Sequence, residues 1–309
     1  MYNTVMKIES RLYRGTSDLE AIIQLITTVR PRQRLAEYPG IIDLQELLSL
    51  PEVQARTRLW LDEQGQLAGF AFVDELSNLY FEADPGRGSD FEETLLDWAI
   101  AEARQAAQER QQSEPPGISC RSDQARLTAL LERHGFCRQP GALHLSRALS
   151  QPIPAPVLPP GFSIRPSLGA VEAEAWVALH RAAHGTEYMT VERRLSIILV
   201  DEFDPALDLV AVAPGERLAA YCVGTIGHRE NALTGCKYGY TDPVATHPDF
   251  QRRGLCRALL CTAMHLLQER GMETARLSTS RENQAMRKAA ESVGFQVEAE
   301  TEWYELPLL

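Results

Sequence analysis

The residues best suited to chemistry form one short run in the second half of the chain, Gln251-Arg252-Arg253-Gly254-Leu255-Cys256-Arg257. Apolar residues recur at helical spacing after Gly254, so a helix is expected to begin there. A glycine lets the backbone approach a ligand closely, and the first turn of a helix leaves amides without intrahelical acceptors. Amides flanked by three guanidinium groups form an anion site, and a pyrophosphate is the natural occupant.

The segment 240–246, before this run, predicts a second contact with the same ligand. Pro243 lies inside an expected strand, where it cannot donate a hydrogen bond, so the strand should be at a sheet edge, bulged, or splayed from its neighbour. The backbone of Val244, Ala245 and Thr246 would then pair with an extended ligand arm that carries amides, as in strand addition. Coenzyme A has both a pyrophosphate and such an arm.

The runs Val244-Ala245-Thr246-His247-Pro248 and 251–256 resemble the acyl-CoA loop of the GCN5-related N-acetyltransferase (GNAT) family, with pattern Q/R-x-x-G-x-G/A. Asn283 and the pair Gly294-Phe295 stand where the family has an asparagine and a closing Gly-Phe, so the resemblance covers most of residues 161–309. It implies an enzyme that transfers an acetyl group from acetyl-CoA, a cosubstrate, to the amine of a small-molecule acceptor by direct attack. The residues implied to bind the cosubstrate are Val244, Ala245, Thr246, Gln251, Arg252, Arg253, Gly254, Leu255, Cys256, Arg257 and Asn283.

A phosphate-binding helix start in some other α/β fold is the alternative interpretation of this loop. A P-loop is disfavoured, because the chain contains no G-x-x-x-x-G-K-S/T motif.

The catalytic groups are less well marked. The resemblance implies that strand-end amides near Ala245 polarise the thioester carbonyl. Asp242 would share a strand face with Tyr240 by two-residue periodicity, which makes it the candidate base, with a structural role as the alternative. The resemblance also implies a tyrosine acid four residues before the Gly-Phe pair, but Ala290 stands there. Tyr240 and Tyr304 are the substitutes considered.

The missing tyrosine leaves other functions open. A non-catalytic acyl-CoA sensor or regulatory module is the main alternative to an enzyme, and an interaction scaffold without a ligand is a third class. Cys256, at a helix start beside arginines, has the setting of a nucleophilic thiolate, but close packing in the motif's small-residue position fits it better. His180 and His184 lack further metal ligands, so no metal is predicted, and with Glu187 they are expected to line the acceptor pocket.

The organisation of the chain follows from a proline-rich stretch, residues 151–160, which is expected to be a semi-rigid linker between domains 1–150 and 161–309. The halves align across it: the hairpin around Gln64-Gly65 matches that around Pro214-Gly215, and Gly135-Phe136 matches Gly294-Phe295. The sequence therefore predicts an α/β (α+β) fold of two tandem GNAT-like domains, each a mixed, mostly antiparallel sheet flanked by helices. Two unrelated α/β domains are the alternative. The architecture resembles the tandem acetyltransferases, of which mycothiol synthase is one example.

The first copy is expected to be degenerate and to bind no CoA. Where the second copy has its arginines, the first has Glu92 and Glu93, whose carboxylates suit the positive end of a helix dipole but repel a pyrophosphate.

The composition of the chain limits which partners and which cellular compartment are expected. A formal net charge of −11 argues against a nucleic-acid partner. Six cysteines without a C-x-x-C pair suit a reducing cytoplasm, and neither a signal peptide nor a membrane-spanning run is apparent. A monomer or a homodimer is expected.

Overall fold

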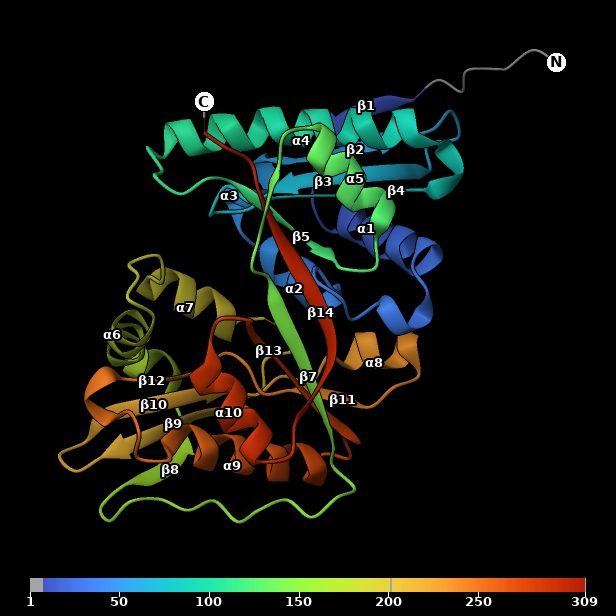
Figure 1. Ribbon diagram of the computed structural model, residues 1–309. Helices are drawn as coiled ribbons and strands as arrows, with labels where there is room; N and C mark the ends of the chain where they lie inside the picture. The colour runs from blue at the N-terminus through green and yellow to red at the C-terminus, as the bar shows by residue number, and fades with distance from the viewer. Residues whose placement is uncertain (1–7, 201, 309) are drawn as a thin grey trace. The chain divides into compact units, whose positions relative to one another are not determined.

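The structure is a computed structural model that describes residues 8–200 and 202–308 (Figure 1). The chain forms two compact units, one of Met1–Gly141 with Thr301–Leu309 and one of Ala142–Glu300. Among the described residues, no helix combines the length and the apolar character that crossing a bilayer requires.

The first unit is built on an antiparallel sheet in the order β1-β2-β3-β4. Apolar residues of the long helix α4 lie three or four positions apart, at Leu96, Ala99 and Ala103, and they form the core of the unit with the sheet. The elements are β1 (Glu9–Leu12), α1 (Thr16–Val29), α2 (Ile41–Leu47), α3 (Pro51–Ala55), β2 (Thr57–Leu61), β3 (Leu67–Val73), β4 (Leu79–Ala83), α4 (Ser89–Glu109), β5 (Gly117–Arg121), α5 (Ala125–Arg133) and β6 (Cys137–Gln139).

The second unit contains one sheet in the order β12-β10-β9-β8 and a set of strands in the order β11-β13-β7-β14, in which only β11 and β13 are parallel. Helix α9 buries a continuous apolar face against both sets. The elements are β7 (Ala142–Ala148), β8 (Ser163–Pro166), α6 (Ala173–His184), α7 (Val191–Ile198), β9 (Asp208–Ala213), β10 (Arg217–Val223), α8 (His228–Thr234), β11 (Tyr238–Tyr240), β12 (Val244–Thr246), α9 (Leu255–Glu269), β13 (Thr274–Ser280), α10 (Gln284–Ser292) and β14 (Gln296–Glu305).

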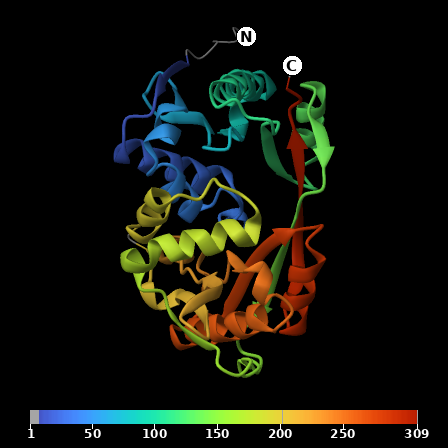
Figure 2. The ribbon, with the colours of Figure 1, turned by 90° about the vertical axis from the view of Figure 1, so that its left-hand side faces the viewer.

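Two strands pair outside the half of the chain that the proline-rich stretch assigns them to. Strand β7 precedes that stretch but lies between β13 and β14 in the second unit, and β7 and β14 are side by side in both views (Figure 1, Figure 2). Strand β14 pairs with β7 up to Glu300, and from Thr301 it pairs with β5 in the first unit.

The predicted α/β (α+β) class, with mixed and mostly antiparallel sheets flanked by helices, is confirmed. The compact units divide at 141/142 and 300/301, whereas the sequence suggested a linker at 151–160. That stretch lies inside the second unit, and its residues 152–159 form neither helix nor strand. The alternation of apolar and polar residues along β7 and β14 indicates strands, but it does not indicate which sheet each strand joins.

Candidate functional site

The candidate site of the second unit begins where its two sets of strands separate. Thr241 N still donates to Arg276 O of β13 (2.9 Å), but Pro243 O accepts from Val223 N of β10 (3.0 Å). On its other side the chain stays paired with β10 and the residues after it, since Tyr240 already pairs with Thr225. Only the pairing with β13 is lost after Thr241, and β12 becomes the end strand of its sheet. The splayed edge strand that Pro243 predicts is present.

The backbone groups of β12 alternate between β10 and the open side. Bonds from Val223 N to Pro243 O and from His247 N to Ala219 O fix the phase of this antiparallel ladder, in which Ala245 is opposite Tyr221. Alternation then directs the amide and carbonyl of Ala245 to β10 and those of Val244 and Thr246 away from it. No described strand pairs with β12 on that side. The sequence expected all three residues to be open; the structure directs two of them outward, and the carbonyl of Thr246 is in long contact with Gln251 Nε2 (3.5 Å).

The loop before α9 has the backbone shape of an anion site. Arg252 and Gly254 have φ angles of +62° and +82°, with Arg253 outside the positive region between them, and such alternation turns successive amides toward one concavity. The first intrahelical bond of α9 runs from Ala258 N to Gly254 O (3.0 Å), and no side chain caps the helix. The amides of its first turn are therefore left to solvent or a ligand.

The side chains around this loop carry uncompensated positive charge. Arg252, Arg253 and Arg257 are exposed, and within the described chain none of the three forms an ion pair with a carboxylate. The nearby Asp249 is paired with Arg217 (2.6 Å), and the first turn of α9 contains no acidic residue. Helix dipole and guanidinium groups therefore act in the same direction on an anion.

Other residues predicted to bind the cosubstrate have visible packing or capping contacts. Leu255 is buried in the core, and Gln251 Nε2 lies 3.5 Å from Thr246 O. Asn283 Oδ1 accepts from Met286 N (3.0 Å), so it caps α10. Burial raises the pKa of Cys256 to about 12, and its Sγ contacts Met286 Sδ at 3.7 Å. Cys256 is thus a neutral thiol between two helices.

The structure separates the residues considered for catalysis. Tyr240 ends β11, and its hydroxyl donates to Glu230 Oε1 (2.6 Å). Asp242 lies between the strands, and its Oδ2 accepts from Ser278 N of β13 (3.0 Å). The expectation that Asp242 and Tyr240 share one face of a continuous strand is therefore wrong, because the strand is interrupted at 241–243.

The positions connected with the missing acid are both buried. Ala290 is fully buried and packs with Phe295 in the core between α9 and α10. Tyr304 is buried in the core of the first unit, beside Ile118, so it does not belong to the residues of the second unit that surround β12.

The two histidines of α6 belong to an aromatic stack. His180 and His184 have ring centroids 4.5 Å apart, and His184 Nε2 lies 3.0 Å from the hydroxyl of Tyr221. Burial lowers the pKa of His180 to about 4 and also lowers that of His184, so both rings are neutral near pH 7. Glu187 pairs with Arg181 (2.8 Å). The described residues contain no group of three or more potential metal ligands.

Glu230 is the polar residue that sequence reasoning missed. It lies on α8, a seven-residue helix whose sequence is mostly polar, yet only 2% of its surface is exposed. Burial of a carboxylate requires a strong partner, and Tyr240 supplies it. No periodic signal in so short a segment distinguishes it from an exposed loop.

In the first unit, the corresponding helix start is acidic. Glu92 and Glu93, in the first turns of α4, pair with Arg126 and Arg133 of α5 at 2.7 and 2.9 Å. Arg87, before the helix, pairs with Asp62 (2.7 Å). These arginines are engaged with carboxylates.

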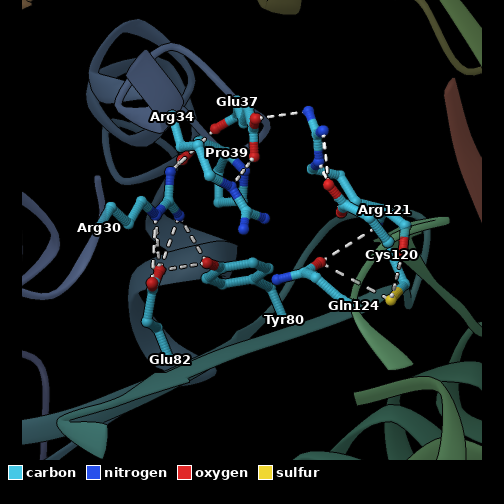
Figure 3. A network of polar contacts seen from close by, with 10 residues as sticks. Arg30, Arg34, Glu37, Pro39, Tyr80, Glu82, Cys120, Arg121 and Gln124 are labelled. Carbon is cyan, nitrogen blue, oxygen red and sulfur yellow. Dashed lines mark hydrogen bonds and ion pairs between the residues drawn. The ribbon is translucent and has the colours of Figure 1, made fainter. Parts of the chain in front are cut away.

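A network at the end of β4 in the same unit is likewise self-contained. Figure 3 shows Arg30 between Glu82 and Tyr80, with its Nη2 2.7 Å from Glu82 Oε2 and 2.6 Å from the tyrosine hydroxyl. Arg121 Nη1 reaches Glu37 Oε1 at 2.7 Å. The charges of this network are balanced by its own residues.

The geometry of the second unit agrees with a comparison to protein families: residues 173–295 match the model of the acetyltransferase (GNAT) family. The chain contains a GNAT-family domain. In fold, the whole chain is similar to a GCN5-related N-acetyltransferase from Sphaerobacter thermophilus (TM-score 0.72, 20% identity, 97% of this chain and 96% of that one). It is also similar to a tandem GNAT protein from the clavulanic acid biosynthesis pathway (TM-score 0.67, 15% identity, 97% and 98%). These likenesses show a tandem GNAT fold.

Relatives of the GNAT domain by sequence include mycothiol acetyltransferases. The protein of that name from Kineococcus radiotolerans is 30% identical over 173 residues, 52% of this chain and 54% of its own length. The one from Pseudarthrobacter chlorophenolicus is 30% identical over 135 residues, 42% of this chain and 41% of its own length. A third, from Thermomonospora curvata, is 25% identical over 278 residues, 87% and 89% of the two chains. The chain thus spans about half the length of the first two relatives.

Proposed function

We propose that this chain transfers an acetyl group from acetyl-CoA to the amine of a small-molecule acceptor, with the chemistry confined to the second unit. The observation that carries the proposal is the loop before α9, where first-turn amides and three exposed arginines surround Gly254. This arrangement suits a pyrophosphate. The mycothiol acetyltransferase relatives support a small molecule as the acceptor.

The rest of the cosubstrate would bind along the open edge of β12. The outward amides and carbonyls of Val244 and Thr246 would pair with the amide-bearing arm, and an outward amide would also polarise the thioester carbonyl. The acceptor amine then attacks the carbonyl directly. A neutral, partly buried Cys256 thiol supports this route over a covalent acyl-cysteine.

The first unit serves as a scaffold in this proposal and binds no CoA. The acidic start of α4 and its ion pairs support this role, because a diphosphate there would meet Glu92 and Glu93 in the first turns. The reaction is assigned to the cytoplasm, since all six cysteines are free thiols.

The second candidate is a non-catalytic acyl-CoA sensor. One observation favours it: Ala290, where the family resemblance implies a tyrosine acid, is fully buried in an apolar core. A sensor needs the loop and β12 but no proton donor.

Charge reversal tests the CoA site. The double variant Arg252→Glu/Arg257→Glu should weaken CoA binding by roughly a hundredfold, equal to about 2.8 kcal/mol, in isothermal titration calorimetry. The matched control is Arg126→Glu/Arg133→Glu in the first unit, which changes the net charge equally and should leave the affinity within about twofold. Unchanged affinity in a folded Arg252→Glu/Arg257→Glu protein would contradict the proposal.

Turnover separates the enzyme from the sensor. Release of free thiol from acetyl-CoA is measured across a library of small amines. Thermal stabilisation by acetyl-CoA without thiol release for any amine would identify the sensor instead.

A further inference from the structure

Acetyl transfer requires a group that takes a proton from the attacking amine and a group that protonates the leaving thiolate. We propose that Tyr240 and Glu230 form a proton relay that does both, with Arg276 beside it. This inference rests on the proposed function and assigns a role to a carboxylate of α8.

The location of Tyr240 follows from the separation of the strands. Pairing of β11 with β13 ends at Tyr240 opposite Arg276, whereas pairing on the other side continues from Tyr240 with Thr225 to β12 with β10. The open side of β12 therefore closes at residues 240–242. A ligand arm that leaves the loop at Gly254 and follows β12 past Thr246 and Val244 ends at this closed point, so its thioester end lies near Tyr240.

The side chain of Tyr240 lies on the side of the strand away from α9. A Cβ on Gly239 would meet Leu267 of α9 at 2.5 Å, so that position of the strand faces α9. Side chains alternate along a strand, so Tyr240 lies on the opposite face, toward α8. Tyr240 is half-buried, whereas Glu230 is 2% exposed. Tyr240 is thus the more accessible member of the pair and Glu230 the enclosed one, as a relay requires.

The polar groups around the pair are suited to moving a proton. The hydroxyl of Tyr240 donates to Glu230 Oε1 at 2.6 Å, and the Arg276 guanidinium is hydrogen-bonded to the same phenol. Arg276 also lies over the ring of Tyr238 (3.7 Å to the centroid) and donates to Glu298 (3.0 Å). A cation beside the phenol oxygen stabilises the negative charge that appears when its proton moves.

His228 and Arg229 of α8 and the nearby Glu202 are further titratable or charged groups among the described residues around the pair. Oε1 of Glu202 accepts from Arg229 N at 3.0 Å, at the start of the helix. Glu202 thus contacts the backbone of α8.

The step balances in protons. As the amine nitrogen forms its bond to the thioester carbon, its proton passes to the oxygen of Tyr240, and the tyrosine's own proton passes to Glu230. When the carbon–sulfur bond breaks, Glu230 returns the proton through Tyr240 to the sulfur, and CoA leaves as a thiol. The pair ends the cycle as it began, so the chain needs no separate acid at Ala290.

The test compares Glu230→Gln and Tyr240→Phe with Asn231→Ala in the full-length protein. Asn231 lies next to Glu230 on α8 and holds the helix to β11 through bonds to Tyr238 O and N (2.8 and 2.9 Å). Its variant weakens the attachment of α8 without touching the relay. Folding is checked by thermal melting, and the affinity for CoA by calorimetry.

Glu230→Gln and Tyr240→Phe should each lower kcat by roughly a hundredfold or more, while the affinity for CoA stays within about twofold. In wild type, the rate should fall at low pH as the carboxylate becomes protonated, and Glu230→Gln should lose this dependence. Asn231→Ala should lower Tm but keep kcat within about threefold and retain the pH profile.

If the Glu230→Gln variant had the same kcat and the same pH profile as the wild type, the relay would be overturned and the proposed function would remain. An equal fall of kcat in Asn231→Ala would also overturn it, since anchoring of α8 would then explain the loss. Absence of thiol release by wild type with every amine would overturn the proposed function and the relay together.

Discussion

Two features of the surroundings of Cys256 have opposite effects on the pKa of its thiol. It lies in the first turn of α9 close to arginines, a setting that favours a thiolate. Its side chain, however, is enclosed between α9 and α10, and burial raises the pKa of the thiol to about 12. Loss of solvation outweighs the helix dipole here, so the thiol stays protonated at neutral pH.

We therefore expect Cys256→Ala to keep kcat within about threefold, because the side chain supplies only packing. Intact mass measurement of wild type mixed with acetyl-CoA should reveal no acetylated protein. In alkylation at pH 8, the exposed Cys137 should react before Cys256. An acetyl group found on Cys256 would contradict direct transfer.

At the scale of elements, β12 matters because only alternate residues are open. The backbone of Ala245 is committed to Tyr221 of β10, whereas that of Thr246 is directed away. Substituting proline at Ala245 or at Thr246 removes the amide donor of that residue. The two variants therefore distinguish pairing within the sheet from binding of the ligand.

Thr246→Pro should leave the fold intact and weaken CoA binding by roughly tenfold, the worth of one hydrogen bond. Ala245→Pro should instead lower the free energy of unfolding by about 3 kcal/mol, because it breaks the ladder with β10. Thermal melting and calorimetry on both variants measure these effects. Equal loss of stability in the two would show that Thr246 also pairs within the sheet.

The sequence predicts the elements of the site better than their exact partners. Gly254 and the apolar spacing after it locate the start of α9, and Pro243 locates the splayed strand, because both signals are local. The loss of pairing with β13 at 241–243, where Asp242 leaves the strand, depends on strands that are distant in the sequence. The burial of Glu230 likewise depends on Tyr240, ten residues away.

For the whole molecule, the decisive feature is the pairing of β7 and β14. Leu143 and Leu145 of β7 are at most 2% exposed and belong to the core of the second unit. Their burial contributes roughly 3–6 kcal/mol, comparable with the net stability of a domain. The proline-rich stretch is the visible boundary in the sequence, but it separates β7 from the sheet that it completes.

Two fragments test this organisation, since both contain the loop at Gly254. Residues 142–300 should unfold cooperatively on heating and be stabilised by CoA, because they retain β7. Residues 151–309 should lack a cooperative transition, since β13 and β14 lose the strand between them. Equal melting temperatures for the two would contradict the importance of β7.

Strand β14 pairs with strands of both units, so a change in one half of the gene also affects the other half. A duplicated copy that has stopped binding a cosubstrate is ordinarily free to drift until it is lost. Here the last residues of the half to which we assign the reaction find their partner strand in the half that we propose to bind no CoA. Under the proposed function, selection on the reaction would therefore preserve the sheet of the first half while its loops vary freely, and recombination at the prolines that deletes or exchanges either half would damage both.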